Sequence, residues 1–98
     1  MTILGLARRS GKIVVGCKAC EESIKRQTAK LIIVAEDAGN STKRNFWHLA
    51  NKHHVKILDF KNKKSLGELV GFREAAVLVV TDTNFAQTIG ELYKSGGE

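Results

Sequence analysis

The sequence predicts an α/β fold in which helices cover a small sheet on both faces. Two short runs, 30–35 and 75–80, are rich in β-branched residues and apolar at successive positions, as in fully buried strands. Segments that repeat apolar residues every three or four positions, as amphipathic helices do, lie before, between and after these runs. With 98 residues, of which 43% are hydrophobic and 27% charged, the chain has the composition of one globular domain. Alternating helices and strands of this kind pack as a sheet between helical layers.

Nine elements are expected, and hydrophobic periodicity identifies each of them. In chain order they are a helix at 2–9, a strand at 12–15, a helix at 17–27, a strand at 30–35, a helix at 41–53, a strand at 55–58, a helix at 63–70, a strand at 75–80 and a helix at 83–93. The helical residues expected to face the sheet are Ile3, Leu6, Ala7, Cys17, Cys20, Ile24, Phe46, Leu49, Ala50, Leu66, Leu69, Phe85, Ile89 and Leu92.

Capping residues mark several helix boundaries. Asn40 or Ser41 is the expected N-cap of the third helix. Asp82 or Thr83 is expected at the start of the fifth, because such side chains accept a hydrogen bond from a free backbone N–H. Gly71 is expected just beyond the end of the fourth helix, where a left-handed conformation is common.

Positive charge is concentrated in the first two thirds of the chain. The net charge is +6, but residues 1–64 contain 14 Lys and Arg against 5 Asp and Glu, whereas residues 65–98 contain 2 against 5. A basic surface of this kind most often binds nucleic acid and less often a membrane, and a merely solubilising surface is the alternative. Charge alone does not decide between them.

The chain has the features of a cytosolic protein. No apolar run reaches the ~18–20 residues of a membrane span, and Arg8 and Arg9 follow the first apolar stretch, the reverse of a secretory signal. We therefore expect a cytoplasmic localisation, no membrane association and reduced thiols. No long apolar face is left over, which predicts a monomer. The tail at 95–98 is expected to fray.

Cys17 and Cys20 are the sharpest enzymatic candidates. The pair opens a helix after a strand, where the helix N-terminus and Lys18 would favour a thiolate, as in a dithiol redox enzyme. The chain contains no proline, however, and a thioredoxin-type site needs a cis-proline opposite the dithiol. Two small fillers of an apolar helix face are the favoured interpretation. A zinc site with His48 and His53 is disfavoured because 27 residues separate Cys20 from His48, where a zinc finger has about 12.

No other arrangement of residues suggests catalysis. No serine or histidine has the context of a nucleophile elbow or a catalytic triad, and no second acidic cluster accompanies Glu36 and Asp37 at the end of a strand. Paired acids at such a position are more often helix-capping or loop residues. The sequence therefore predicts no catalytic residue, no metal and no cofactor.

Cations and permissive backbone occur together in the loops that follow the expected strands. Gly16 allows a close backbone approach just before a helix N-terminus, and Lys18 projects from the first turn of that helix. In a layered fold these loops can share one edge, and a rim of backbone donors, cations and a small apolar loop suits structured RNA. The segments of this rim are 16–19, 36–43, 61–64 and 70–74, and the other cations near it are Arg8, Arg9, Lys12, Lys43, Arg44, Lys61, Lys63 and Lys64.

Three segments resemble a known family. Residues 4–16 (LGLARRSGKIVVG), 29–38 (AKLIIVAEDA) and 65–71 (SLGELVG) resemble, in this order, the short bacterial YlxQ-like members of the ribosomal protein L7Ae/L30e family. The likeness covers nearly the whole chain. It implies a three-layer α-β-α sandwich around a four-stranded mixed sheet with five helices. It also implies a single domain over residues 1–98 that binds kink-turn RNA and catalyses no reaction.

The start of the second helix departs from the family pattern. A kink-turn is a duplex bent at a three-nucleotide bulge beside sheared G·A pairs, which opens its major groove to a helix N-terminus. The family presents Gly-Thr-Asn-Glu-x-x-Lys there, where this chain has residues 16–22. Lys18 can still donate to a guanine, but Ala19 cannot replace the glutamate and Glu22 reverses the charge of the lysine. Each lost charged hydrogen bond costs roughly 1.5–3 kcal/mol, so RNA binding is expected with weaker or shifted kink-turn affinity.

The loop at 70–74 corresponds to the family's loop that packs on extruded bases. Phe72 can stack on such a base while Arg73 holds its phosphate, or Phe72 can fold back into the core. The residues that the cationic loops and the resemblance assign to RNA are Arg9, Lys12, Gly16, Cys17, Lys18, Ala19, Glu36, Asp37, Lys43, Lys64, Val70, Gly71, Phe72 and Arg73.

The leading hypothesis is a non-catalytic RNA-binding protein, ribosomal or ribosome-associated, that recognises a kink-turn or a similarly bent structured RNA. The first alternative is a ribosome-associated adaptor with mainly protein partners and weak kink-turn affinity, which the departures at Ala19 and Glu22 motivate. The second is a dithiol redox protein that uses Cys17 and Cys20.

Overall fold

The computed structural model describes residues 2–94, with side chains as far as Tyr93. Within this range it contains the nine expected elements in the expected order. They are α1 (Ile3–Arg9), β1 (Ile13–Val15), α2 (Cys17–Lys25), β2 (Leu31–Ala35), α3 (Asn40–His53), β3 (Lys56–Phe60), α4 (Lys63–Leu69), β4 (Val77–Val80) and α5 (Thr83–Lys94). The expected fraying at 95–98 concerns residues outside the described range.

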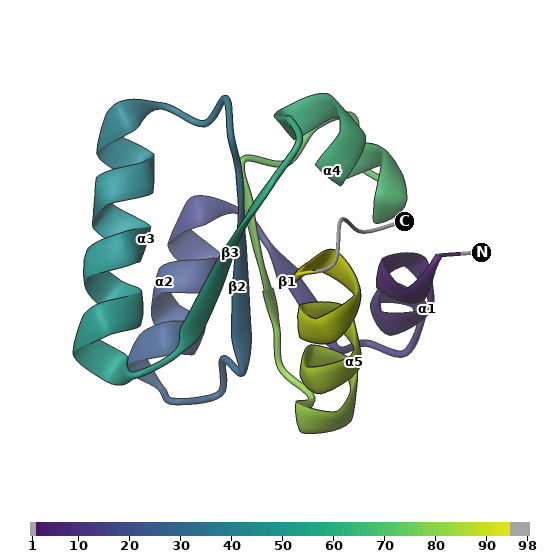
Figure 1. Ribbon diagram of the computed structural model, residues 1–98, viewed down its shortest axis with the longest axis horizontal. Helices are drawn as coiled ribbons and strands as arrows, with labels where there is room; N and C mark the ends of the chain where they lie inside the picture. Colours follow the sequence, from purple (N-terminus) through teal and green to yellow (C-terminus); the bar gives the residue numbers. More distant parts are fainter. Residues whose placement is uncertain (1, 95–98) are drawn as a thin grey trace.

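The four strands form one mixed sheet in the order β1-β4-β2-β3. β2 and β3 are parallel, with Ala35 opposite Phe60, whereas β4 is antiparallel to both β1 and β2. β1, β2 and β3 therefore all finish where β4 begins, at the top of the molecule in Figure 1. We call this the upper end, made of residues 16–19, 36–44, 61–64 and 70–74, and the opposite one the lower end, made of residues 10–12, 25–30, 52–56 and 81–83.

Helices cover both faces of this sheet. Successive side chains of a strand point to opposite faces, so Leu31, Ile33 and Ala35 of β2 belong to one core, and Ile32 and Val34 belong to the other. The first core is packed by α1, α4 and α5, and the second by α2 and α3, which lie on the two sides of the sheet in Figure 1. This arrangement confirms the three-layer α-β-α sandwich.

Three helical residues expected to face the sheet are exposed instead. In α1, the buried face passes through Leu4 and Ala7, which lie one turn apart and are fully buried. Leu6 lies off this face and is 46% exposed. Cys17 is exposed because α2 begins at the edge of the sheet, so that its first turn extends past the strands. Leu92 lies beside the inward face of α5 and is exposed. The next residue, Tyr93, packs edge-on against Phe60, with 5.2 Å between the ring centres.

The observed caps agree with the expected ones in two of three helices. Asp82 accepts a hydrogen bond from Phe85 N at 2.9 Å at the start of α5, and Gly71 has a φ of +80° after α4. The N-cap of α3, however, is Gly39, without a side-chain hydrogen bond, and Asn40 is already helical. Within residues 2–94, no helix combines the length and apolarity that crossing a membrane requires.

Candidate nucleic-acid interface

The upper end assembles loops that are distant in the sequence. Backbone hydrogen bonds join them across the sheet, from Gly16 N to Val77 O at 3.3 Å and from Ala35 N to Ala76 O at 2.8 Å. A third bond runs from the N–H of Glu36 to the oxygen of Phe60 at 2.7 Å. The four segments of the expected rim therefore lie together, because each follows a strand that finishes here or precedes the strand that begins here.

Two helices present uncapped N-termini at this end. The N-caps of α2 and α3 are Gly16 and Gly39, and neither has a side-chain capping bond, whereas Thr2, Asn62 and Asp82 cap α1, α4 and α5 with their side chains. The first N–H groups of a helix have no partner within it and carry partial positive charge. In α2 these groups belong to the exposed residues 17–19, so they are open to an external acceptor.

Gly16 has a backbone conformation that suits glycine alone. Its φ is +106°, in the region that side-chain-bearing residues rarely adopt, and a Cβ built there would meet nothing within 4 Å. The conformation therefore is not a response to crowding. It turns the chain from β1 directly into α2 and leaves open space in front of the helix.

The acidic turn after β2 has a structural task. Asp37 Oδ1 accepts a hydrogen bond from Lys63 N at 2.7 Å, which fixes the start of α4 beside the turn. Lys43 Nζ donates to the backbone oxygen of Glu36 at 3.1 Å, which fixes the first turn of α3 on the other side. Asp37 therefore caps a helix, which agrees with the expectation that paired acids after a strand are helix-capping or loop residues. Asn40, Lys43 and Arg44 line a shallow hollow of about 350 Å³ beside this turn.

The loop after α4 projects Phe72 away from both cores. Gly67 packs so closely on the Glu74 backbone that a Cβ would clash there, and Phe72 N donates to Gly67 O at 2.8 Å. The Phe72 ring is 40% exposed, so the interpretation in which it folds back into the core is wrong. The guanidinium of Arg8 lies 5.4 Å from the centre of this ring and covers part of it. Val70 is buried beneath the loop, while Gly71 and Arg73 are exposed.

Not every residue assigned to RNA reaches the upper end. Lys18 and Lys64 are exposed in the first turns of α2 and α4, and belong to it. Lys12, however, precedes β1, and its backbone oxygen accepts from Thr81 N at 2.9 Å at the lower end. Arg9 is the last residue of α1, on the turn that leads to Lys12. Arg8 was expected only as a cation near the rim and was not among the residues assigned to RNA, because its partner ring lies far away along the chain.

Comparisons with known proteins agree with this architecture. A family model described as the ribosomal protein L7Ae/L30e/S12e/Gadd45 family matches residues 1–89. The chain belongs to this family.

Its similarity to individual proteins extends over most of each chain. It is 31% identical over 87 residues to the RNA-binding protein YlxQ of Bacillus subtilis, covering 89% of this chain and 87% of the relative. It is 35% identical over 91 residues to the large ribosomal subunit protein eL8 of Thermoplasma volcanium, covering 91% and 72%. A solved structure of a protein with unknown function from Bacillus halodurans C superposes with a TM-score of 0.91 at 25% identity, covering 94% and 93%.

The structure places the departures from the L7Ae/L30e pattern on the surface of α2. Ala19 and Glu22 are both exposed, so neither substitution is compensated within the core. The neighbouring Glu21 is half-buried and accepts a hydrogen bond from Asn45 Nδ2 at 3.0 Å, which ties α2 to α3. Of the two acids, Glu22 is therefore the more exposed one.

The two cysteines have different environments. Burial raises the pKa of the Cys20 thiol to about 12, with smaller contributions from Cys17 and Glu21, and its Sγ donates to Val14 O at 3.3 Å. A thiol that stays protonated throughout the physiological range is a poor nucleophile, which agrees with the filler interpretation for Cys20. Cys17 is exposed in the first turn of α2. Among residues 2–94 there is no group of three or more His, Cys, Asp or Glu side chains placed to hold a metal ion.

Proposed function

We propose that this protein binds structured RNA at its upper end and stabilises a kink-turn, without catalysing a reaction. The observation that carries the proposal is the pair of uncapped helix N-termini, α2 and α3, which open side by side at one end of the sheet among exposed cations. The names of two relatives, RNA-binding protein YlxQ and large ribosomal subunit protein eL8, support RNA as the partner and the ribosome as its source.

Within this surface, different groups are proposed to contact the bases and the phosphates. The free N–H groups of residues 17–19 and the ammonium of Lys18 face acceptors on guanine edges in the opened groove, while Lys43, Arg44 and Lys64 face phosphates. The Phe72 ring, held over the edge by Gly67 and Arg8, offers its open side to an unstacked base. Binding of the bent RNA in preference to the extended form shifts the RNA population toward the bend.

A titration with two RNAs tests this function. One RNA is a kink-turn, and the other replaces its G·A pairs with Watson–Crick pairs. We expect tighter binding of the kink-turn and, if about four phosphates are neutralised, a slope of log K against log salt near −3. Equal affinity for the two RNAs would contradict kink-turn recognition.

Lys18→Ala locates the recognition within the upper end. A charged hydrogen bond to a guanine contributes about 1.5–3 kcal/mol, so we expect at least a tenfold loss on the kink-turn and a much smaller loss on the control RNA. Equal weakening on both RNAs would make Lys18 a phosphate contact only.

A ribosome-associated adaptor is the second candidate function. The exposed Glu22 carboxylate, close to the open N-terminus of α2, repels phosphate and favours this candidate. It predicts a protein that ignores isolated kink-turn oligonucleotides yet co-sediments with ribosomal subunits. The monomeric state and the cytoplasmic location stay predictions under either function.

A further inference from the structure

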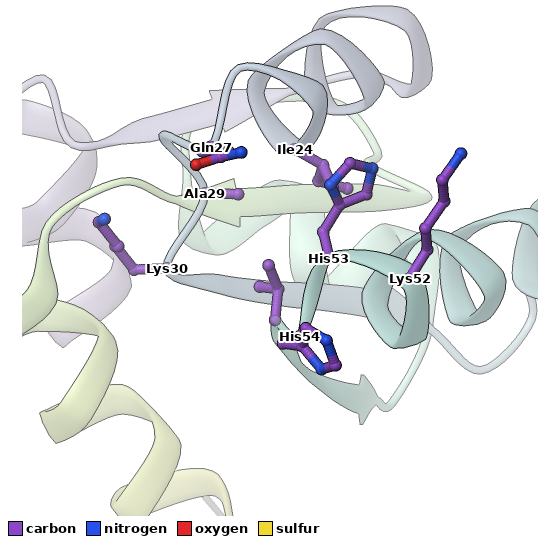
Figure 2. A pocket seen from close by; sticks show the side chains of 8 residues that line it. Ile24, Gln27, Ala29, Lys30, Lys52, His53 and His54 are labelled. Atoms are coloured by element: carbon purple, nitrogen blue, oxygen red, sulfur yellow. The ribbon is translucent and has the colours of Figure 1, made fainter.

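A hollow of about 510 Å³ opens at the lower end, at the other end of the sheet from the proposed RNA site but on the same face, which α2 and α3 cover. It lies where α2 and α3 finish and β2 and β3 begin. Figure 2 shows Lys30 and Lys52 on opposite sides of it, with the rings of His53 and His54 between them. Gln27 extends toward it from the turn after α2. Left-handed backbone at Gln27 and His54, with φ of 64° and 56°, ends the two helices and turns these side chains toward the hollow.

Positive charge dominates this hollow. Helix C-termini carry about half a negative elementary charge each, and α2 and α3 both finish here. Lys30 and Lys52 contribute two full positive charges, which outweigh those partial charges. The ammonium of Lys56, in the adjoining hollow, lies instead near Gly90 of α5, on the other face of the sheet. Among the described residues that line the two hollows there is no Asp or Glu. An anion is therefore the complementary ligand.

An exposed aromatic ring lies in the adjoining hollow. This second hollow, of about 400 Å³, shares His54 and Val55 with the first and is lined by Trp47 and Lys56. Trp47 is 46% exposed and belongs to neither core, whereas its neighbour Phe46 is fully buried. Nearly half of the Trp47 side chain is therefore open to solvent. Together the hollows offer a stacking platform beside Lys30 and Lys52, and proteins hold single-stranded nucleic acid by this combination of an aromatic ring and cations.

We propose that the lower end is a second RNA-binding surface, which takes a single-stranded segment. One base stacks on Trp47, and the backbone phosphates lie between Lys30 and Lys52. The inference extends the RNA-binding function proposed above, because a strand leaving a kink-turn at the upper end would then be held at the lower end. β2 separates the two ends by only about 17 Å, the length of a five-residue strand.

Fluorescence anisotropy with a short oligouridine tests this surface separately from the kink-turn site. Trp47→Ala is expected to weaken oligouridine binding about tenfold, and Trp47→Phe to restore most of the loss, because stacking needs a ring rather than an indole. Leu6→Ala is the matched control, since Leu6 is equally exposed, at 46%, on a different helix. We expect this control to bind like the wild type.

A charge experiment tests the phosphate contacts. Lys30→Gln with Lys52→Gln is expected to reduce the slope of log K against log salt by about 1.4, the value for two contacts on a single strand. The matched control is Lys25→Gln with Arg26→Gln, which removes the same charge from the same end of the molecule but from side chains that line neither hollow. We expect it to change the slope by less than half as much.

A blunt-ended kink-turn RNA has no single-stranded segment, so it reports on the upper end alone. It therefore separates a failure of the lower-end inference from a failure of the proposed function. Trp47→Ala should bind that RNA normally, and Lys18→Ala should bind oligouridine normally. The lower-end proposal is overturned if the wild type does not bind oligouridine at low salt, or if Lys18→Ala rather than Trp47→Ala removes that binding. In either case kink-turn binding at the upper end would stand untouched.

Discussion

The two ends of the sheet differ in what the helices offer there. At the upper end α2 and α3 begin, so backbone N–H groups without side-chain caps face outward, and acids such as Asp37 and Glu22 interrupt the cations. At the lower end the same two helices finish, so carbonyl groups face outward and lysines overlie them. The difference in helix ends follows from one topological fact, that β1 and β2 run in the same direction, so the helices that follow them both begin at the upper end.

Under the two proposals, this contrast would give one small protein two modes of RNA recognition. Backbone donors in fixed positions at the upper end can select one geometry of the ligand, because each N–H needs an acceptor in a particular place. Lys30 and Lys52 beside the exposed Trp47 ring can bind single strands of many sequences and shapes, because phosphate contacts and stacking do not depend on the base. We therefore expect specificity from the upper end and additional affinity from the lower end.

The largest expected effect is a gain of kink-turn affinity at the upper end alone. Ala19→Glu with Glu22→Lys restores two of the family residues that this chain lacks, both at exposed positions of α2. Two recovered charged hydrogen bonds predict roughly a hundredfold tighter binding, measured by titration with kink-turn RNA. Oligouridine binding should not change. An equal gain on the RNA without G·A pairs would show that only net charge matters, and would break the contrast between the ends.

The next largest effect is on stability and concerns the loop that carries Phe72. Gly67→Ala places a methyl group against the Glu74 backbone and is expected to lower the free energy of unfolding by about 2 kcal/mol, measured by urea denaturation. The matched control is Gly90→Ala in α5, where a Cβ meets nothing closer than Lys56 Nζ at 3.7 Å. A helical alanine there should stabilise by about 0.5–1 kcal/mol. Equal effects of the two substitutions would contradict the close packing of the loop on α4.

The smallest effect concerns the thiol beneath the start of α2. Burial raises the pKa of Cys20 from 9.0 to about 12, so above pH 9 the unfolded chain loses a proton that the folded protein retains. From this group alone, the free energy of unfolding at pH 10 should therefore be lower than at pH 8 by about 1.4 kcal/mol. Denaturation at pH 8, 9 and 10 should show a shallower decline for Cys20→Ala than for Cys17→Ala or the wild type. The same decline with pH in Cys20→Ala and the wild type would contradict the raised pKa of the buried Cys20 thiol.

Much of the fold could be predicted because its signals are local. The β-branched runs at 30–35 and 75–80 became the two central strands, and their burial on both faces follows from helices on each side. Less could be predicted where a face or a boundary depends on neighbours. Leu6 is exposed although it fits the helical spacing, and β3 continues to Phe60 because β2 pairs with it as far as Ala35.

For the candidate site, the sequence predicted which loops meet but not which individual side chains lie together. The segments after the strands meet at the upper end, as the alternating order required, but Lys12 lies at the other end because β1 carries the chain across the sheet. The pairing of Arg8 with Phe72 joins residues that no local pattern connects. The same holds for the hollows beside Trp47, which exist only where two helix ends and two strand starts converge.

The central claim is that the open N-terminus of α2 receives the RNA. Its most direct test is an NMR titration that follows the backbone amide signals as blunt-ended kink-turn RNA is added. We predict the largest shifts at the amides of residues 17–19, with further changes at 40–44 and 71–73 and none at 52–55. Unchanged signals at 17–19 in a protein that binds the RNA would contradict the account.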